Sequence, residues 1–167
     1  KTFMWPKSFW YKVYEPFIRK AAGFGVASIK HDKERYEHKY EYCDLLITGS
    51  GPSGLASAYA AAKNGARVIL AEDKPRFGGS LLTSEATIGN QSGKEWANSI
   101  ITELKEMPNV IVKNRAQVFG YYDHNMLVMS ERINDHLPKS KKYSPKQRLW
   151  YIRAKEVVIS SGSIERP

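Results

Sequence analysis

The residues with the clearest chemical potential are three closely spaced glycines, Gly49, Gly51 and Gly54, within TGSGPSGLASA. Glycines at this spacing allow a tight turn, the approach of a pyrophosphate to the backbone, and close packing of a helix on a strand. The N-terminus of the following helix adds free N–H groups and about half a positive charge. We therefore expect the loop from Gly49 to Gly54, including Pro52 and Ser53, to bind a pyrophosphate.

An acidic pair follows the second apolar run, VILAED. Glu72 lies eighteen residues beyond Gly54, close to the spacing at which a carboxylate reaches the ribose of a dinucleotide. We expect Glu72, and less directly Asp73, to accept hydrogen bonds from the ribose hydroxyls. A carboxylate here repels a 2′-phosphate, which favours NAD or FAD over NADP, although Lys74 and Arg76 are nearby.

The elements around these residues alternate between strand and helix. LLIT reads as a buried strand, SGLASAYAAAKNG as a helix ended by Gly65, and ARVILAE as a second buried strand. A second helix, SGKEWANSIITELKEM, with Ser92 as its cap, then leads into NVIVK. Two consecutive crossovers predict a parallel sheet in the order 3-2-1 with helices packed against it.

The following segment changes its period. QVFGYYD, NMLVMSERI and RLWYIR are predicted to be three extended segments of an antiparallel meander over about 115–153. KEVVISSGS is then expected to return to the parallel sheet as a separate strand. The domain is therefore predicted to be an α/β dinucleotide-binding fold over 44–167.

Residues 1–43 differ from the rest, being aromatic at first and then crowded with mixed charge. We expect this extension to contain one helix, in YKVYEPFIRKAAGFG, with Pro16 in its first turn and Gly23 or Gly25 at its end. Its aromatic side chains make it too apolar to stay in water and it is too short to form its own core, so we expect it to pack on the following domain or on another polypeptide region.

Composition limits the remaining classes of function. A hydrophobic content of 42% indicates a folded protein, and the chain contains no apolar run long enough to cross a membrane. Cys43 is the only cysteine, which excludes an internal disulfide or a cysteine-based metal site and fits the cytoplasm. The formal charge of +9 is densest in HLPKSKKYSPKQR, but no recognition helix accompanies it, so we expect no nucleic acid partner.

The chain resembles the alpha subunits of heterotetrameric sarcosine oxidases. The matching stretches are FMWPKSFWYKVYEPFIRKAAGFG, CDLLITGSGPSGLASAYAAAKNGARVILAED, FGGSL, VFGYYDHNMLV and PKQRLWYIRAKEVVISSGSIERP, which run in order along the whole chain. The resemblance implies the Rossmann-like FAD/NAD(P)-binding fold of proteins with two dinucleotide-binding domains. Because those subunits are several times longer, it also implies an internal piece whose first domain is incomplete on its C-terminal side.

The resemblance further implies an oxidoreductase complex that demethylates sarcosine, with folate as the one-carbon acceptor. NAD is expected in this segment, while FAD and FMN belong elsewhere in the complex, and other subunits are the protein partners. The implied cofactor-binding residues extend the glycine loop and the acidic pair by six more: Gly78, Gly79, Ser80, Val118, Ser161 and Gly162. Neither a catalytic residue nor a metal ligand is expected in this segment.

Two other readings stay open. The glycine loop alone does not separate NAD from FAD, because both present the same ADP half, so the chain could be the FAD-binding part of another amine dehydrogenase or of a disulfide reductase. The absence of a cysteine pair counts against a disulfide reductase. A scaffold with a vestigial fold would rest on the basic loop and the aromatic extension.

Overall fold

The computed structural model describes residues 5–25, 27–137 and 144–163. The chain divides into two compact units, Lys1–Lys33 and Glu34–Pro167. This division lies ten residues before the predicted domain boundary, because the first strand, β1, already begins at Tyr36. The basic residues at 139–142, which dominate the predicted charged loop, lie outside the described residues.

The described part of the N-terminal unit contains a short helical stretch, Lys7–Ala21, followed by an irregular segment. The helical stretch is built from a 3-10 turn, a π-helical turn and an α-helix: η1 (Lys7–Phe9), η2 (Trp10–Tyr14) and α1 (Glu15–Ala21). Pro16 lies in the first turn of α1 and Gly23 adopts a φ of 73° after its end, as the sequence predicts. None of the helical residues is buried within this unit.

The second unit contains a mixed sheet of six strands in the order β5-β2-β1-β8-β7-β6. The main elements in chain order are β1 (Tyr36–Thr48), α2 (Pro52–Lys63), β2 (Val68–Ala71), α3 (Gly93–Glu106), β5 (Val110–Lys113), β6 (Ala116–Tyr122), β7 (Met126–Arg132) and β8 (Gln147–Ile159). Shorter elements are η3 (Gly79–Leu82), β3 (Thr87–Ile88), β4 (Gln91–Ser92) and η4 (Asp123–Asn125). The predicted 3-2-1 order is confirmed by β5-β2-β1, which are parallel.

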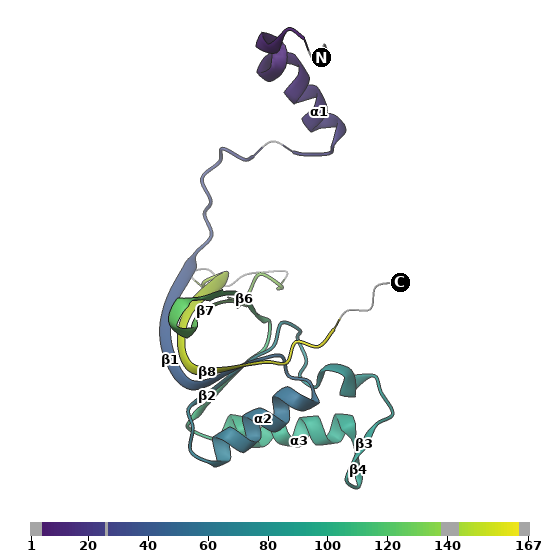
Figure 1. Ribbon diagram of the computed structural model, residues 1–167, viewed down its shortest axis with the longest axis vertical. Coiled ribbons are helices and arrows are strands. Elements are labelled where there is room, and N and C mark those ends of the chain that lie inside the picture. Colours follow the sequence, from purple (N-terminus) through teal and green to yellow (C-terminus); the bar gives the residue numbers. More distant parts are fainter. Residues whose placement is uncertain (1–4, 26, 138–143, 164–167) are drawn as a thin grey trace. The chain divides into compact units, whose positions relative to one another are not determined.

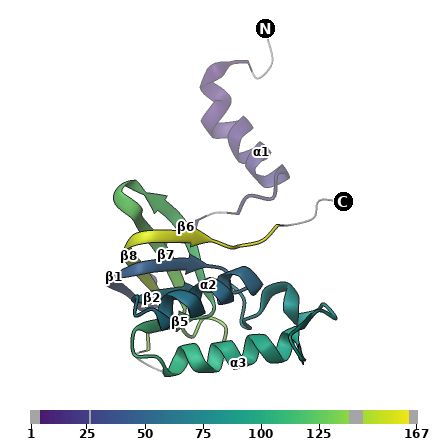
Figure 2. The ribbon, with the colours of Figure 1, turned by 60° about the horizontal axis from the view of Figure 1, so that its bottom comes forward.

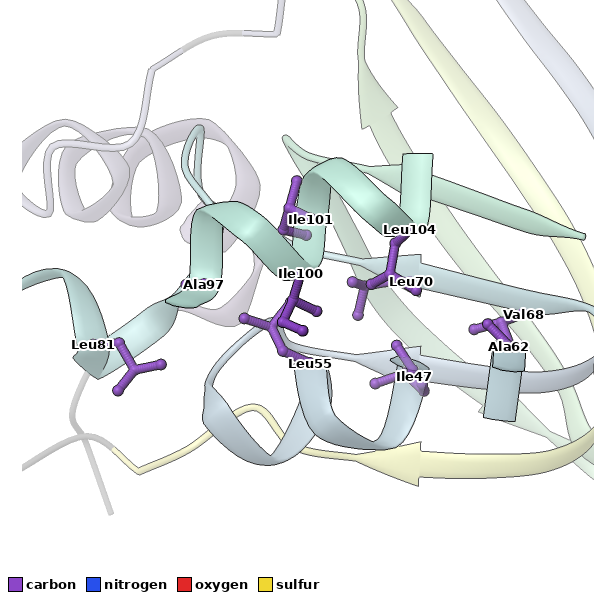
Figure 3. Packing of buried hydrophobic residues seen from close by; sticks show 11 residues of the cluster. Ile47, Leu55, Ala62, Val68, Leu70, Leu81, Ala97, Ile100, Ile101 and Leu104 are labelled. Carbon is purple, nitrogen blue, oxygen red and sulfur yellow. The ribbon is translucent and has the colours of Figure 1, made fainter. Parts of the chain in front are cut away.

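One face of the parallel strands is covered by α2 and α3 (Figure 2). Their apolar side chains meet those of the strands in one cluster, which includes Ile47, Leu55, Leu70, Ile100 and Leu104 (Figure 3). Both helices begin with recognisable signals. Pro52 occupies the first turn of α2, and α3 starts with a capping box between Ser92 and Glu95.

The opposite face is covered by the meander, which curves back over the sheet (Figure 1). Trp150, Met129 and Leu127 from the meander pack there with Leu46 and Ile69 of the parallel strands. This second core ties the antiparallel half of the sheet to the parallel half.

The meander differs from the prediction in one respect. RLWYIR and KEVVIS are one continuous strand, β8, and not two. Its first part pairs with β7 from Gln147 to Arg153, while its whole length runs parallel to β1. The connection at Ala154–Lys155 contains no glycine or proline, so nothing interrupts the extended backbone. Among the described residues, no helix has the length and apolar character required to cross a membrane.

Candidate dinucleotide-binding site

The glycine loop joins the end of β1 to the start of α2, where two of its glycines are required by close packing. Gly49 adopts a φ of 98°, and a Cβ atom added there would overlap the carbonyl oxygen of Ser160. A Cβ atom on Gly54 would overlap the carbonyl oxygen of Gly49 and lie 2.6 Å from the hydroxyl of Ser160. These two glycines therefore allow β1, α2 and the end of β8 to meet.

Gly51 is different, because a Cβ atom there would have no neighbour within 4 Å. Its φ of −67° is also open to other residues. The first hydrogen bond of α2 runs from Leu55 N–H to the carbonyl of Gly51. The N–H groups of Gly51, Ser53 and Gly54 have no partner among the described residues. Open space beside unpaired N–H groups at a helix N-terminus fits a pyrophosphate.

Glu72, directly after β2, turns its carboxylate toward this loop. One oxygen accepts hydrogen bonds from the Ser50 N–H at 2.9 Å and the Ser50 hydroxyl at 2.5 Å. The other accepts a bond from the Lys74 N–H at 2.9 Å. Glu72 is only 6% exposed, yet a carboxylate offers about four lone-pair sites. Glu72, the residue predicted to bind the ribose, therefore also fixes the glycine loop in place. Its carboxylate still has capacity to accept a hydrogen bond from a further donor.

A second loop, Gly78–Ser80, lies against the glycine loop. The N–H of Gly78 donates to the carbonyl of Ser50 at 3.0 Å and to its hydroxyl at 3.2 Å. A Cβ atom on Gly79 would lie 2.9 Å from the Cα of Gly51, and Ser80 follows in the first turn of η3. Three predicted residues are thus brought next to the pyrophosphate loop.

Of the other predicted residues, Ser161 adjoins the glycine loop, because a Cβ atom on Gly49 would lie 3.1 Å from the Cα of Ser161. Ser161 and Gly162 follow β8 and are exposed, and Gly162 has a φ of 73°. Val118 lies in β6, two residues after Ala116, whose N–H donates to the carbonyl of Glu72 at 2.8 Å. Asp73 is exposed, and its carboxylate forms an ion pair with Lys74 at 3.3 Å.

Two serines in this region were not predicted as site residues. Ser50 is 1% exposed and links both loops to Glu72. The Ser160 hydroxyl lies within hydrogen-bonding distance of the carbonyls of Thr48 and Gly49, at 3.0 and 2.9 Å. The sequence offered only a weak signal for them, since Ser50 stands between two glycines at a position for which the glycine spacing specifies no residue type, and Ser160 lies two residues before Gly162.

The four histidines were predicted to be surface or turn residues. His38 lies exposed in β1, stacked on Tyr151 at 5.9 Å, and His124 lies in the turn η4 with a φ of 58°. In the described part of the chain, no three His, Cys, Asp or Glu side chains are grouped so as to hold a metal ion.

The chain matches one family model in sequence and resembles solved structures in fold. A family model described as FAD dependent oxidoreductase matches residues 44–135, more than half of the chain. The fold is similar to that of L-proline dehydrogenase from P. horikoshii, with a TM-score of 0.60 and 19% identity over 85% of this chain and 26% of that one.

Sequence relatives extend over the whole chain. Sarcosine oxidase subunit alpha from Rhizobium meliloti (strain 1021) is 45% identical over all 167 residues, which span 17% of that protein. The subunit of the same name from Corynebacterium sp. (strain U-96) is 36% identical over 87% of this chain and 15% of its own length. The chain thus belongs to the FAD dependent oxidoreductase family and is homologous, from end to end, to part of the sarcosine oxidase alpha subunit.

Proposed function

We propose that this chain binds the ADP half of a dinucleotide as part of an oxidoreductase complex. The observation that carries the proposal is the position of the Glu72 carboxylate, which is hydrogen-bonded to the glycine loop at Ser50. The loop offers three unpaired N–H groups among the described residues, and open space at Gly51. A group of two phosphates beside a ribose matches this arrangement of donors and acceptor.

In this proposal each loop has one task. The N–H groups of Gly51, Ser53 and Gly54 donate to the pyrophosphate, and the Gly78–Ser80 loop closes over it. Glu72 accepts from the ribose, with Asp73 at the rim. The backbone of Val118 contacts the adenine, and Ser161 with Gly162 lines the far side. These tasks require only positioned backbone groups and one carboxylate, so substrate oxidation takes place outside this segment.

NAD is the dinucleotide we propose first, because the similarity to sarcosine oxidase alpha subunits covers the whole chain. FAD is the second candidate, and the match to the FAD dependent oxidoreductase family favours it. A bound dinucleotide would supply a hydride-accepting or hydride-donating ring. The described residues of this chain account for the binding of its ADP half only.

The same similarity supports the wider proposal that the parent complex oxidises a secondary amine at its CH–NH bond, with sarcosine as the substrate. Other subunits would be its partners in a heterotetramer, with FAD at the site of substrate oxidation and FMN between subunits. The chain spans 17% of the length of the relative from Rhizobium meliloti, so these properties concern the larger assembly. The predicted cytoplasmic location stays a prediction.

Identification of the bound nucleotide tests the proposal directly. The purified chain is denatured and the released nucleotide is identified by mass spectrometry, after a visible spectrum has been recorded for flavin. If the chain is purified empty, calorimetric titrations with NAD, FAD and ADP-ribose replace this step. Released NAD, or tighter binding of NAD than of FAD, supports the first candidate. Flavin bound here replaces it with the second, and the lack of binding by all three compounds contradicts the proposal.

A further inference from the structure

Ser160, at the end of β8, contacts the start of the glycine loop through its side chain. Its hydroxyl lies 3.0 Å from the carbonyl oxygen of Thr48 and 2.9 Å from that of Gly49. A serine hydroxyl has one proton to donate. The Thr48 carbonyl already accepts a hydrogen bond from the Ser160 N–H at 2.8 Å, whereas the Gly49 carbonyl has no other donor among the described residues. The hydroxyl proton is therefore assigned to the Gly49 carbonyl.

The space for this hydrogen bond exists because residue 54 is a glycine. A Cβ atom on Gly54 would overlap the carbonyl oxygen of Gly49 and would lie 2.6 Å from the Ser160 hydroxyl. By contrast, no atom of Gly49 or Ser160 lies within 4 Å of a Cβ atom placed on Gly51. The Gly49 carbonyl thus points toward Gly54 and β8, and not into the open space beside Gly51.

The same peptide group is held at its other end by Glu72. The Ser50 N–H belongs to the peptide unit that carries the Gly49 carbonyl, and it donates to the Glu72 carboxylate at 2.9 Å. The N–H and carbonyl of a trans peptide point in opposite directions. Ser160, at the end of β8, therefore fixes one end of this peptide, and Glu72, after β2, fixes the other.

We propose that Ser160 is a positioning residue for the pyrophosphate, acting through the Gly49–Ser50 peptide. Its hydroxyl keeps the Gly49 carbonyl turned away from the phosphates, so that the loop presents N–H groups to them. Without the hydroxyl, this peptide is free to rotate, since glycine tolerates many backbone conformations. A rotated peptide would direct a carbonyl oxygen toward the negatively charged phosphates and would withdraw the Ser50 N–H from Glu72. The inference rests on the proposed function, because it places the phosphates beside Gly51.

Calorimetric titrations of this chain with ADP and with adenosine test the proposal. Adenosine carries the adenine and the ribose but no phosphate. In Ser160→Ala the affinity for ADP should fall by about fivefold or more, the equivalent of one hydrogen bond, while the affinity for adenosine should fall much less. A general loosening of the site would lower both affinities by the same factor. Ser163→Ala, at an exposed position three residues further along, is the matched control and should bind both compounds like wild type.

Amide hydrogen exchange of the ligand-free chain, followed by NMR, provides a second readout. The Ser50 N–H should exchange about tenfold or more faster in Ser160→Ala, because its peptide is then held at one end only. The amides of Ile47 and Leu70, which are fully buried in the core, should keep their wild-type rates and so report an intact fold.

Two results would overturn the inference while the proposed function stands. One is an equal loss of affinity for ADP and adenosine in Ser160→Ala, or no loss at all. The other is an unchanged exchange rate at Ser50. A wild-type chain that binds neither ADP nor adenosine would instead contradict the proposed function, and the role of Ser160 in pyrophosphate binding would fall with it.

Discussion

Ser50 and Glu72 form the most closely connected pair of polar side chains in the site. The Ser50 hydroxyl donates to the carboxylate at 2.5 Å and its N–H donates to the same oxygen at 2.9 Å. Both residues are buried, at 1% and 6% exposure. A buried carboxylate needs such donors to remain oriented. The glycine loop and the acidic residue are consequently one structural unit.

Ser50→Ala should expose the importance of this unit. The substitution removes one donor from a buried carboxylate, and the expected loss in the free energy of unfolding is about 1–3 kcal/mol. Dinucleotide affinity should fall as well, because Glu72 loses its fixed orientation. Urea denaturation and calorimetric titration measure the two effects. Ser53→Ala, at an exposed position whose side chain makes no hydrogen bond to the described residues, is the matched control and should change stability by less than about 0.5 kcal/mol.

Gly51→Ala and Gly54→Ala should separate binding from folding. Gly51 has open space around a Cβ position and a common φ, so its alanine variant should fold normally but lose dinucleotide affinity by about tenfold or more. Gly54 has no such space, so its variant should be destabilised. Thermal melts and titrations of both proteins decide this. Normal affinity in Gly51→Ala would mean that the pyrophosphate lies elsewhere.

The sequence predicted the elements of this site better than their connections. The glycine spacing and the all-apolar VILA run identify the loop and β2, because a buried parallel strand and a phosphate loop have local signatures. The hydrogen bond between Ser50 and Glu72 joins residues 22 positions apart and depends on tertiary packing, so no local sequence pattern predicts it. The early start of β1 was missed for a similar reason. Its polar YEHKYEY segment forms a strand because it pairs with β8, and not because its side chains are buried.

Ser92→Ala should weaken the start of α3. The Ser92 hydroxyl accepts from the Glu95 N–H at 3.3 Å, and the Glu95 carboxylate accepts from the Ser92 N–H at 3.0 Å. Loss of an N-cap side chain costs about 1 kcal/mol, which denaturant titration can measure. Ser99→Ala, within the same helix, is the control and should have a smaller effect. Equal losses in the two variants would contradict the capping role.

Asp44 should contribute to stability against acid. Hydrogen bonds from the Arg67 side chain, followed by Lys155, hold the pKa of the Asp44 carboxyl well below its usual range. A lowered folded-state pKa gives stability that is complete above the unfolded value of about 3.9 and is lost as pH falls below it.

Asp44→Asn should therefore be less stable than wild type at pH 7, and the difference should shrink as the pH falls below about 4. Thermal melts at several pH values measure this. Glu85→Gln, which removes an exposed carboxylate that has no ion pair among the described residues, provides the comparison. A constant difference between Asp44→Asn and wild type at all pH values would show that the ion pair is not its cause.

Cys43 should react very slowly with thiol reagents in the folded protein. It is 2% exposed within β1, and burial, with a further contribution from the charge of Asp44, raises the pKa of its thiol to about 12. Because the thiolate is the reactive form, a disulfide reagent at pH 8 should label the native chain far more slowly than urea-unfolded chain. An exposed thiol introduced by Ser84→Cys should react at once and serves as the control. Labelling of native Cys43 at the rate of the exposed thiol would contradict its burial in the second core.

The raised pKa of Cys43 also affects stability. The unfolded chain loses the thiol proton at a lower pH than the folded chain, so the free energy of unfolding should decline as pH rises above about 8.5.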